Sequence, residues 1–312
     1  MIFSINYIHI IHMFCAPDRQ NGTSSCLDVA ELRSLAAHYN KVVGLDPIPL
    51  NSFESAISLV TDLGDRLNSA CDADGKSKGD HCWIEQKFVK MSDMYSQLQK
   101  NFLPLKPSSW KANEKEWLNT YDILNAMRPY ERKYKDFQFL GAFPSDFSKT
   151  SKADGSCIIQ SMCQFEITKF IASGKKRFGI VINLDKHNQP GSHWVACSCC
   201  LDQTSPQYGI CYFDSGGKKP QRDVIDFIKN VKLQMETRMK GKGMAATGHQ
   251  PRFKFNHEQK QFRNTECGVF AMLFLITCLQ NQDKTYKSVR AMIVSDKQDK
   301  KIHAFRNKFY RE

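Results

Sequence analysis

The sequence predicts an α+β fold, in which a central mixed β-sheet lies between helices and a helical accessory domain precedes it. Three observations support this. Residues 178–184 form a nearly continuous apolar run, which is typical of a central buried strand. Residues 193–213 have the pattern of a β-hairpin with its turn near 203–207. Apolar side chains recur at helical spacing within 220–239 and predict a long amphipathic helix.

The first domain is expected to span residues 1–104 and to be helical. Helices are predicted near 27–36, with a Ser-Ser pair as the N-terminal cap, and over 53–67 and 91–102. A proline-containing linker follows at 103–109. Because no catalytic combination of residues occurs here, we expect this domain to dock a substrate or partner.

The second domain is expected to span residues 105–312. Beyond the elements above, the periodicity predicts helices over 114–127, 164–172, 267–280 and 296–311 and strands over 137–140 and 252–255. The glycine-rich segment 241–248 is expected to be flexible.

The chain is basic, with 44 Lys and Arg against 32 Asp and Glu, a formal charge of +12 and a pI near 9.1. The basic residues are scattered, and no nucleic-acid-binding motif accompanies them. We therefore expect a charged surface in contact with water and no specific nucleic-acid partner.

The apolar run at residues 1–14 is too short to span a bilayer, and it lacks both a basic start and a convincing cleavage site. No membrane insertion is expected. Met1 and Met13 both remain possible initiators.

Twelve cysteines suggest several types of chemistry. A disulfide framework is not expected, because the chain is long and has no clear secretory signal, so a reducing compartment fits best. Cys197, Cys199 and Cys200 invite a zinc interpretation, but they fall on a predicted strand, whose side chains alternate between faces. No metal and no cofactor are predicted.

Cys267 is the candidate nucleophile. It opens a strongly apolar helical segment, and the N-terminus of a helix favours a thiolate. Gln261, six positions earlier, is close enough to offer an amide donor to an oxyanion beside the sulfur. The alternative is that Cys267 is one more buried cysteine that packs as a small apolar side chain.

His193 and Asp214 are the candidate base and its orienting acid. His193 begins the first strand of the predicted hairpin, and Asp214 follows the second, so both fall at the open end. An acid there can fix the imidazole tautomer while the other ring nitrogen faces the thiol. Taken singly, a histidine before a strand is more often a surface residue, and Asp-Ser-Gly-Gly is more often an ordinary turn; their combination with Cys267 favours catalysis.

The sequence resembles the Ulp/adenain clan of cysteine proteases in three respects. The candidate residues follow in the order His, Asp, Gln and Cys, a Trp directly follows the His, and the nucleophile lies in a Gln-x5-Cys-Gly motif. Segments 117–123, 139–147 and 178–185 are similar to the core-protein proteases of large cytoplasmic DNA viruses, such as that of African swine fever virus. The similarity is clear over 105–312 and loose before that. It implies an Ulp/adenain-like fold and these roles: His193 base, Asp214 orienting acid, Gln261 oxyanion donor, Cys267 nucleophile. We expect Trp194 to flank the imidazole and narrow the substrate cleft.

The resemblance implies a viral thiol endopeptidase that processes structural polyprotein precursors, after a Gly-Gly-like site, in the host cytoplasm and the virion. An isopeptidase acting on SUMO- or ubiquitin-like tails uses the same chemistry and stays open. A catalytically idle scaffold is a third reading, which the complete set of four residues opposes. The oligomeric state and any activating factor are not determined by the sequence.

Overall fold

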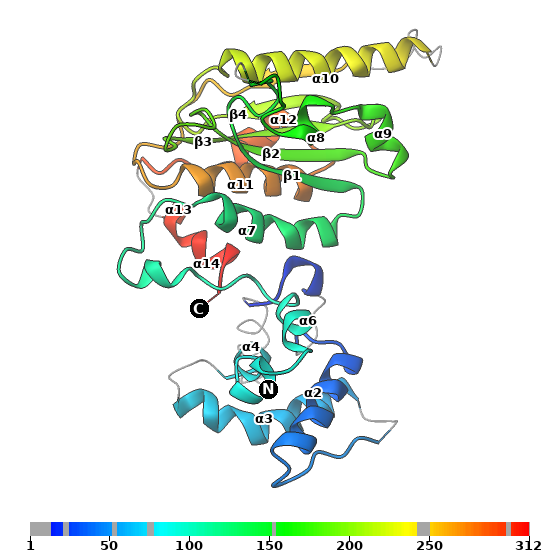
Figure 1. The fold of residues 1–312 in the computed structure, drawn as a ribbon, viewed down its shortest axis with the longest axis vertical. Helices are drawn as coiled ribbons and strands as arrows, with labels where there is room; N and C mark the ends of the chain where they lie inside the picture. Colours follow the sequence, from blue (N-terminus) through cyan, green and yellow to red (C-terminus); the bar gives the residue numbers. More distant parts are fainter. Residues whose placement is uncertain are drawn as a thin grey trace. The chain divides into compact units, whose positions relative to one another are not determined.

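The structure is a computed structural model, which describes residues 14–20, 25–51, 55–73, 78–151, 154–241, 250–297 and 301–311. The choice between Met1 and Met13, and the expected flexible segment beyond Gly241, lie outside the described residues. The chain divides into two units, one made of Met1–Lys106 with Asn307–Glu312 and the other of Pro107–Arg306 (Figure 1). We call them the N-terminal unit and the catalytic unit.

The N-terminal unit is helical, as expected, and has its own apolar core. Its elements are η1 (Pro17–Arg19), α2 (Val29–Val42), α3 (Ala56–Ala73), α4 (Asp80–Trp83), α5 (Lys87–Lys90) and α6 (Tyr95–Gln99). The prediction of a Ser-Ser cap was wrong: Asp28 caps α2, in a reciprocal capping box with Glu31. The helix expected over 91–102 is also shorter than predicted, since only α6 forms there.

Four cysteines of the N-terminal unit form the disulfides Cys15–Cys26 and Cys71–Cys82. The expectation that the cysteines are reduced was therefore wrong for these four. Each bridge joins residues 11 positions apart, whose separation along the chain gives no signal that they pair. The other eight cysteines are free.

The chain end packs with the N-terminal unit rather than with the catalytic unit. Arg311 is buried and donates to the Glu85 carboxylate at 2.7 Å and to the Leu103 carbonyl at 3.0 Å. The single helix expected over 296–311 is replaced by two short ones, α13 (Lys301–Ala304) and α14 (Arg306–Phe309).

The catalytic unit is built on one five-stranded mixed sheet, in the order β1-β2-β3-β4-β5. The strands are β1 (Phe137–Pro144), β2 (Arg177–Asn183), β3 (Trp194–Cys200), β4 (Gly209–Phe213) and β5 (Arg252–Phe255). The outer pairs β1–β2 and β4–β5 are parallel, whereas β3 is antiparallel to both neighbours. The predicted hairpin is confirmed as β3 and β4, and the α+β class is confirmed.

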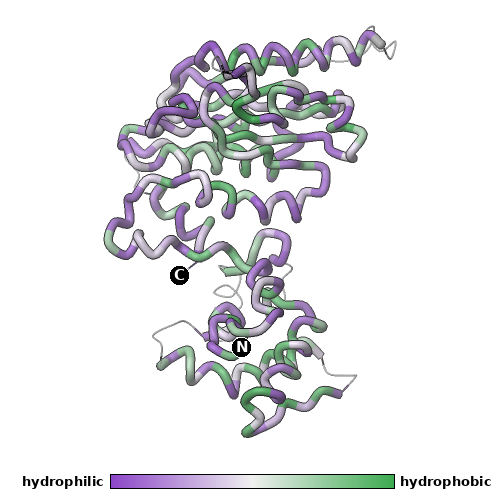
Figure 2. Tube along the Cα trace, in the orientation of Figure 1, coloured by the Kyte–Doolittle hydropathy of each residue, from purple (hydrophilic) through white to green (hydrophobic). Residues whose placement is uncertain are grey.

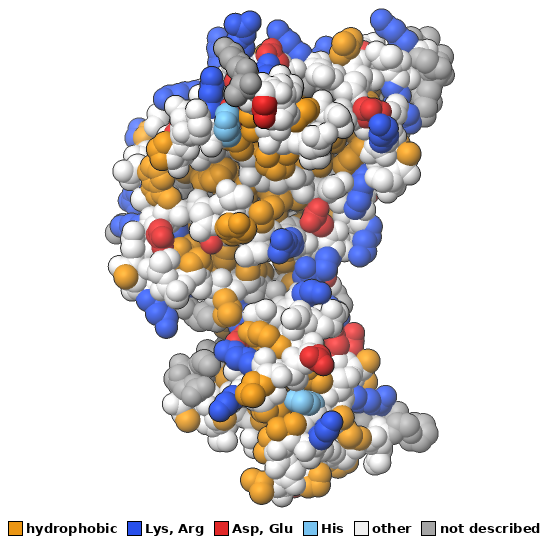
Figure 3. Space-filling model, viewed as in Figure 1, with side chains coloured by type: hydrophobic (Ala, Val, Ile, Leu, Met, Phe, Trp, Pro, Cys, Tyr) orange, Lys and Arg blue, Asp and Glu red, His pale blue; other side chains and the backbone are white. Residues whose placement is uncertain are grey.

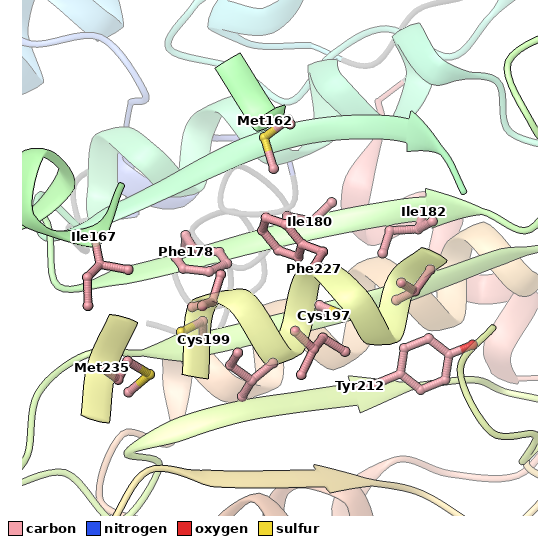
Figure 4. Close-up of a cluster of buried hydrophobic side chains, with 14 of the residues drawn as sticks. Met162, Ile167, Phe178, Ile180, Ile182, Cys197, Cys199, Tyr212, Phe227 and Met235 are labelled. Atoms are coloured by element: carbon pink, nitrogen blue, oxygen red, sulfur yellow. The ribbon is translucent and has the colours of Figure 1, made fainter. Parts of the chain in front are cut away.

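One face of the sheet packs against α10 (Arg222–Gly241), α8 (Gln160–Cys163) and α9 (Ile167–Ala172). Phe178, Ile180 and Ile182 alternate along β2 toward this face and meet Phe227 of α10, as Figure 4 shows. Figure 2 shows the mixture of hydrophobic and hydrophilic residues along α10 that the amphipathic pattern predicts.

The other face packs against α11 (Cys267–Gln280), which is buried on all sides. Phe274 of α11 stacks on Phe213 at 4.8 Å between ring centroids, and Leu275 lies against Gly179 of β2. A helix that is apolar all round is expected in the middle of a domain, so its first residue is held firmly by the core. A helix not anticipated from the sequence, α12 (Tyr286–Met292), packs on α11.

The helix expected over 114–127 begins later, as α7 (Thr120–Lys133). Asn119 caps it in a reciprocal box with Asp122, and the preceding residues form only the short η2 (Ser108–Lys111) and irregular chain. The cap outweighs the helical propensity of the Glu-containing segment before it, which leaves residues 112–119 as turns and irregular chain outside the helix.

Lys and Arg side chains lie at separate places over the catalytic unit in the face shown in Figure 3, in agreement with their scatter along the sequence. No helix among the described residues has the length and apolarity needed to cross a membrane. Within the same residues, no group of three or more His, Cys, Asp and Glu side chains is placed to hold a metal ion.

Candidate active site

Cys267 is the first residue of α11, and Glu266 is the N-cap. The N–H groups of a helix's first turn have no acceptor within the helix and carry the positive end of its dipole. A Cβ at Gly268 would lie only 3.0 Å from Leu118 Cδ1, so a larger residue there would need the Leu118 side chain to shift. Leu118, two residues before α7, therefore lies against the first turn of α11.

His193 and Asp214 meet as the hairpin predicts. Ala196 pairs with Phe213 in the antiparallel β3–β4 ladder, so the residues before β3 and after β4 lie at the same end of the two strands. The His193 Nε2 atom lies 2.7 Å from Asp214 Oδ1. Since Nε2 is engaged by the acid, Nδ1 is the ring nitrogen that remains for the thiol.

The pKa of His193 is raised by both the acid and the thiol, which shows that both lie next to the ring. Burial lowers the pKa of His193, but hydrogen bonds to Asp214 and Cys267, together with their negative charge, outweigh burial and raise the pKa to about 9. The imidazolium is thus the favoured form at neutral pH. A cation beside the sulfur is the arrangement that stabilises a thiolate.

Asp214 is fully buried and held by backbone and side-chain contacts. Asn256 accepts from the Asp214 N–H at 2.9 Å and donates to its carbonyl at 2.6 Å. The Gly216 N–H donates to the same Oδ1 that faces His193, at 2.7 Å. Gly217 has φ +74° and passes against the backbone of residues 257–259, where a Cβ would come within 2.9 Å.

Gln261 lies on the loop that leads to Cys267 and is buried beside the end of β4. Its Oε1 accepts from Ser215 Oγ at 2.6 Å, and its Nε2 donates to the Arg263 carbonyl at 2.6 Å. One of the two Nε2 hydrogens therefore remains for another acceptor.

The loop that carries Gln261 is fixed at both ends. Asp296 accepts from the Phe262 N–H at 2.6 Å. At the other end, Arg306 donates to the Glu266 carboxylate at 3.1 Å and to the Glu116 carbonyl at 2.7 Å. Glu266 is buried, and the His303 Nδ1 atom lies 2.9 Å from Glu266 Oε1. Arg306 thus links the residue before Cys267, through an ion pair, to the segment that precedes α7, through a hydrogen bond to a backbone carbonyl.

Trp194 is nearly buried, and its Nε1 donates to the Leu118 carbonyl at 2.8 Å. Both residues line a hollow of about 770 Å³ beyond the ends of β1 and β2. Trp117, which is 47% exposed, lines the same hollow. Two tryptophans thus line the hollow, and one of them, Trp194, directly follows His193 in the chain.

The structure brings together His193, Asp214 and Cys267, sets Gln261 on the loop before the thiol, and places Trp194 in the lining of the hollow. Sequence reasoning missed Ser215, Asn256 and Leu118, which contact these residues from distant segments. Trp117 lies in the segment 117–123, which the resemblance includes, but was not assigned to the site. A tryptophan two positions ahead of Asn119, a residue type that caps helices, was the available signal.

Comparison with known proteins identifies thiol and cysteine proteases as relatives. Residues 159–312 match the Ulp1 protease family, C-terminal catalytic domain. A thiol protease of Acanthamoeba polyphaga mimivirus is 29% identical over 279 residues, which are 86% of this chain and 85% of the relative. A cysteine protease of African swine fever virus is 30% identical over 135 residues, 43% of this chain and 44% of that protein.

The fold is also found among solved structures. The crystal structure of the African swine fever virus protease superimposes with a TM-score of 0.59, at 19% identity, over 96% of this chain and 95% of that one. The likeness therefore extends over both units.

Proposed function

Residues 159–312 belong to the Ulp1 family of cysteine proteases, with viral thiol proteases as relatives, and from this premise we propose that the chain cleaves viral structural polyprotein precursors. The observation that carries the proposal is the contact of His193 with both Asp214 and Cys267 at the start of a buried helix. A scaffold protein has no need of such a set. The catalytic roles that follow are part of the same proposal.

The chemistry starts with Cys267 as a thiolate paired with the His193 imidazolium. The sulfur attacks the peptide carbonyl, and the oxyanion accepts hydrogen bonds from the free Nε2 hydrogen of Gln261 and from the Cys267 N–H. The tetrahedral intermediate then collapses to a thioester as His193 gives its proton to the leaving amine. Water, deprotonated by His193, hydrolyses the thioester and regenerates the thiol.

Small residues ahead of the scissile bond suit this cleft. Trp194 directly follows His193, is buried and donates its indole N–H to the Leu118 carbonyl, and we propose that the substrate passes this indole on its way to the thiol. A bulky side chain there would need the indole to move, whereas glycine would not. We propose a Gly-Gly-like cleavage site on this ground.

An isopeptidase acting on SUMO- or ubiquitin-like tails is the second candidate, because the matched family is the Ulp1 protease family. The two functions are separated by offering the full chain virion structural precursors and a SUMO-tail fusion in parallel. Cleavage sites are mapped by mass spectrometry, with Cys267→Ala as the inactive control. We expect cleavage of a precursor after a Gly-Gly-like pair; cleavage of the SUMO fusion alone would replace the first proposal with the second.

We propose that the N-terminal unit docks the precursor. The catalytic unit contains all five site residues predicted from the sequence, and the N-terminal unit has a separate apolar core. A chain of residues 107–306 is then expected to retain kcat/KM on a short peptide and to lose about tenfold or more on a full-length precursor, because a tethered second contact is lost. Equal losses on both substrates would show that the N-terminal unit supports the site itself.

We place the enzyme in the host cytoplasm and the virion. The eight free cysteines, Cys267 among them, favour a reducing compartment for catalysis. The two disulfides of the N-terminal unit are typical of an oxidising environment, which accords with a second location in the released particle.

A further inference from the structure

We propose that Ser215 is a positioning residue that aims the Gln261 amide at the oxyanion. This inference rests on the proposed function, since it assumes that Cys267 attacks and Gln261 donates. Its starting point is a contact between two buried side chains that lie 46 positions apart: Ser215 Oγ is 2.6 Å from Gln261 Oε1.

The direction of the Gln261 amide follows from its two neighbours. The Arg263 carbonyl can only accept, so the group facing it at 2.6 Å must be Nε2. Oε1 then faces Ser215, whose hydroxyl must donate. With the amide turned over, two carbonyl oxygens would face each other at hydrogen-bond distance, which is unfavourable in a buried site.

These two contacts also fix the direction of the remaining Nε2 hydrogen of Gln261. An amide group is planar, so fixing Oε1 and one N–H fixes the second N–H as well. Without the Ser215 hydroxyl, Oε1 would be a buried acceptor with no donor, and the amide could turn to seek another. A preorganised donor acts on an oxyanion because it need not reorient during the reaction.

Ser215 also holds the backbone of the same loop. Its carbonyl accepts from the N–H groups of Lys260 at 2.7 Å and Gln261 at 2.9 Å. The residue before it, Asp214, holds His193. Two adjacent residues at the end of β4 therefore contact the catalytic base and the oxyanion donor, one each.

The test is a double-mutant cycle on the full chain with Ser215→Ala, Gln261→Ala and the combined variant. The substrate is a fluorogenic peptide with Gly-Gly ahead of the reporter amide. Removal of an oxyanion donor lowers kcat by about 10²- to 10³-fold, and this is the expectation for Gln261→Ala. Ser215→Ala is expected to lower kcat by about ten- to a hundredfold, to leave KM within about twofold, and to add no loss in the Gln261→Ala background.

Two further readouts separate positioning from a merely structural role. The rate of Cys267 alkylation by iodoacetamide should match the wild-type rate in Ser215→Ala, because this displacement forms no oxyanion. Binding of the corresponding peptide aldehyde, which adds the sulfur to its carbonyl and creates an oxyanion, should weaken in parallel with kcat. Ser198→Ala is the matched control, since Ser198 is a buried serine of β3 that hydrogen-bonds Cys278; it should retain kcat.

Ser215→Cys supplies a second variant of similar size if Ser215→Ala does not fold. Its weak S–H donor should give a kcat between those of the wild type and Gln261→Ala. The inference is overturned if Ser215→Ala and Ser215→Cys keep full kcat while Gln261→Ala loses a hundredfold, or if alkylation slows as much as cleavage. Full activity of Gln261→Ala would instead remove the proposed oxyanion role of Gln261, on which the inference rests.

Discussion

Cys267→Ala is expected to abolish peptide cleavage, with a loss of about 10⁵-fold or more in kcat, while the chain stays folded. The sulfur is the only atom proposed to bond to the substrate, and no other described thiol contacts His193. Alanine fits at the first position of α11 without changing the helix. The measurement is kcat on the Gly-Gly peptide, with circular dichroism to confirm folding.

Cys278→Ala is the control for Cys267→Ala, because Cys278 is a buried thiol of the same helix. It should cost some stability through a small cavity and leave kcat within a few-fold. Residual activity above about a hundredth of wild type in Cys267→Ala would contradict the assignment of the nucleophile.

His193→Ala is expected to lower kcat by about 10⁴-fold or more, because it removes both the cation that stabilises the thiolate and the acid for the leaving amine. His187→Ala is a matched control: His187 lies 2.7 Å from Asp146, a His–Asp pair of the same length in a neighbouring loop. Its removal should leave kcat within a few-fold, although KM can change because His187 lines the hollow. Equal losses in the two variants would contradict the role of His193.

The charge of Asp214 should appear in the pH profile. The pKa of His193 is raised to about 9, so its protonated, active form persists below that pH, and kcat/KM should fall as pH rises through it. Asp214→Asn removes a negative charge that raises this pKa, and the fall should move to lower pH.

Asp214→Asn should be milder than His193→Ala. The Gly216 N–H donates to the atom that faces His193, which selects the amide oxygen for that position and keeps an acceptor for the ring. Kinetics of Asp214→Asn between pH 6 and pH 10 would check both points. If the fall of kcat/KM at high pH stays at the wild-type pH in Asp214→Asn, or if this variant loses as much activity as His193→Ala, the imidazole ring is held in another way.

The parts of the site that the sequence predicts are those set by local pattern. A polar run that meets an apolar helix places Cys267 at a helix start, and the structure has α11 begin at that residue. The antiparallel pairing of β3 with β4 brings the start of the first strand next to the end of the second, and so brings His193 next to Asp214. Both features depend on neighbours within about twenty residues.

The parts that could not be predicted depend on distant segments or on competition between local signals. The bond from Trp194 to Leu118 spans 76 positions, and the one from Ser215 to Gln261 spans 46. Neither of these hydrogen bonds leaves a periodic pattern in the sequence from which it could be predicted. The start of α7 was misplaced because Asn119 and Asp122 form a capping box that overrides propensity, and the disulfides were missed because cysteine pairing is set by the fold.

The central claim is that Cys267 is the nucleophile and that His193 activates it. The most direct test is covalent labelling of the full chain with a Gly-Gly peptide that carries a C-terminal vinyl sulfone, followed by peptide mapping with mass spectrometry. We predict a single label on Cys267, formed rapidly in the wild type and at least about 10³-fold more slowly in His193→Ala. Labelling of another of the eight free cysteines, or a rate on Cys267 that does not depend on His193, would contradict the account.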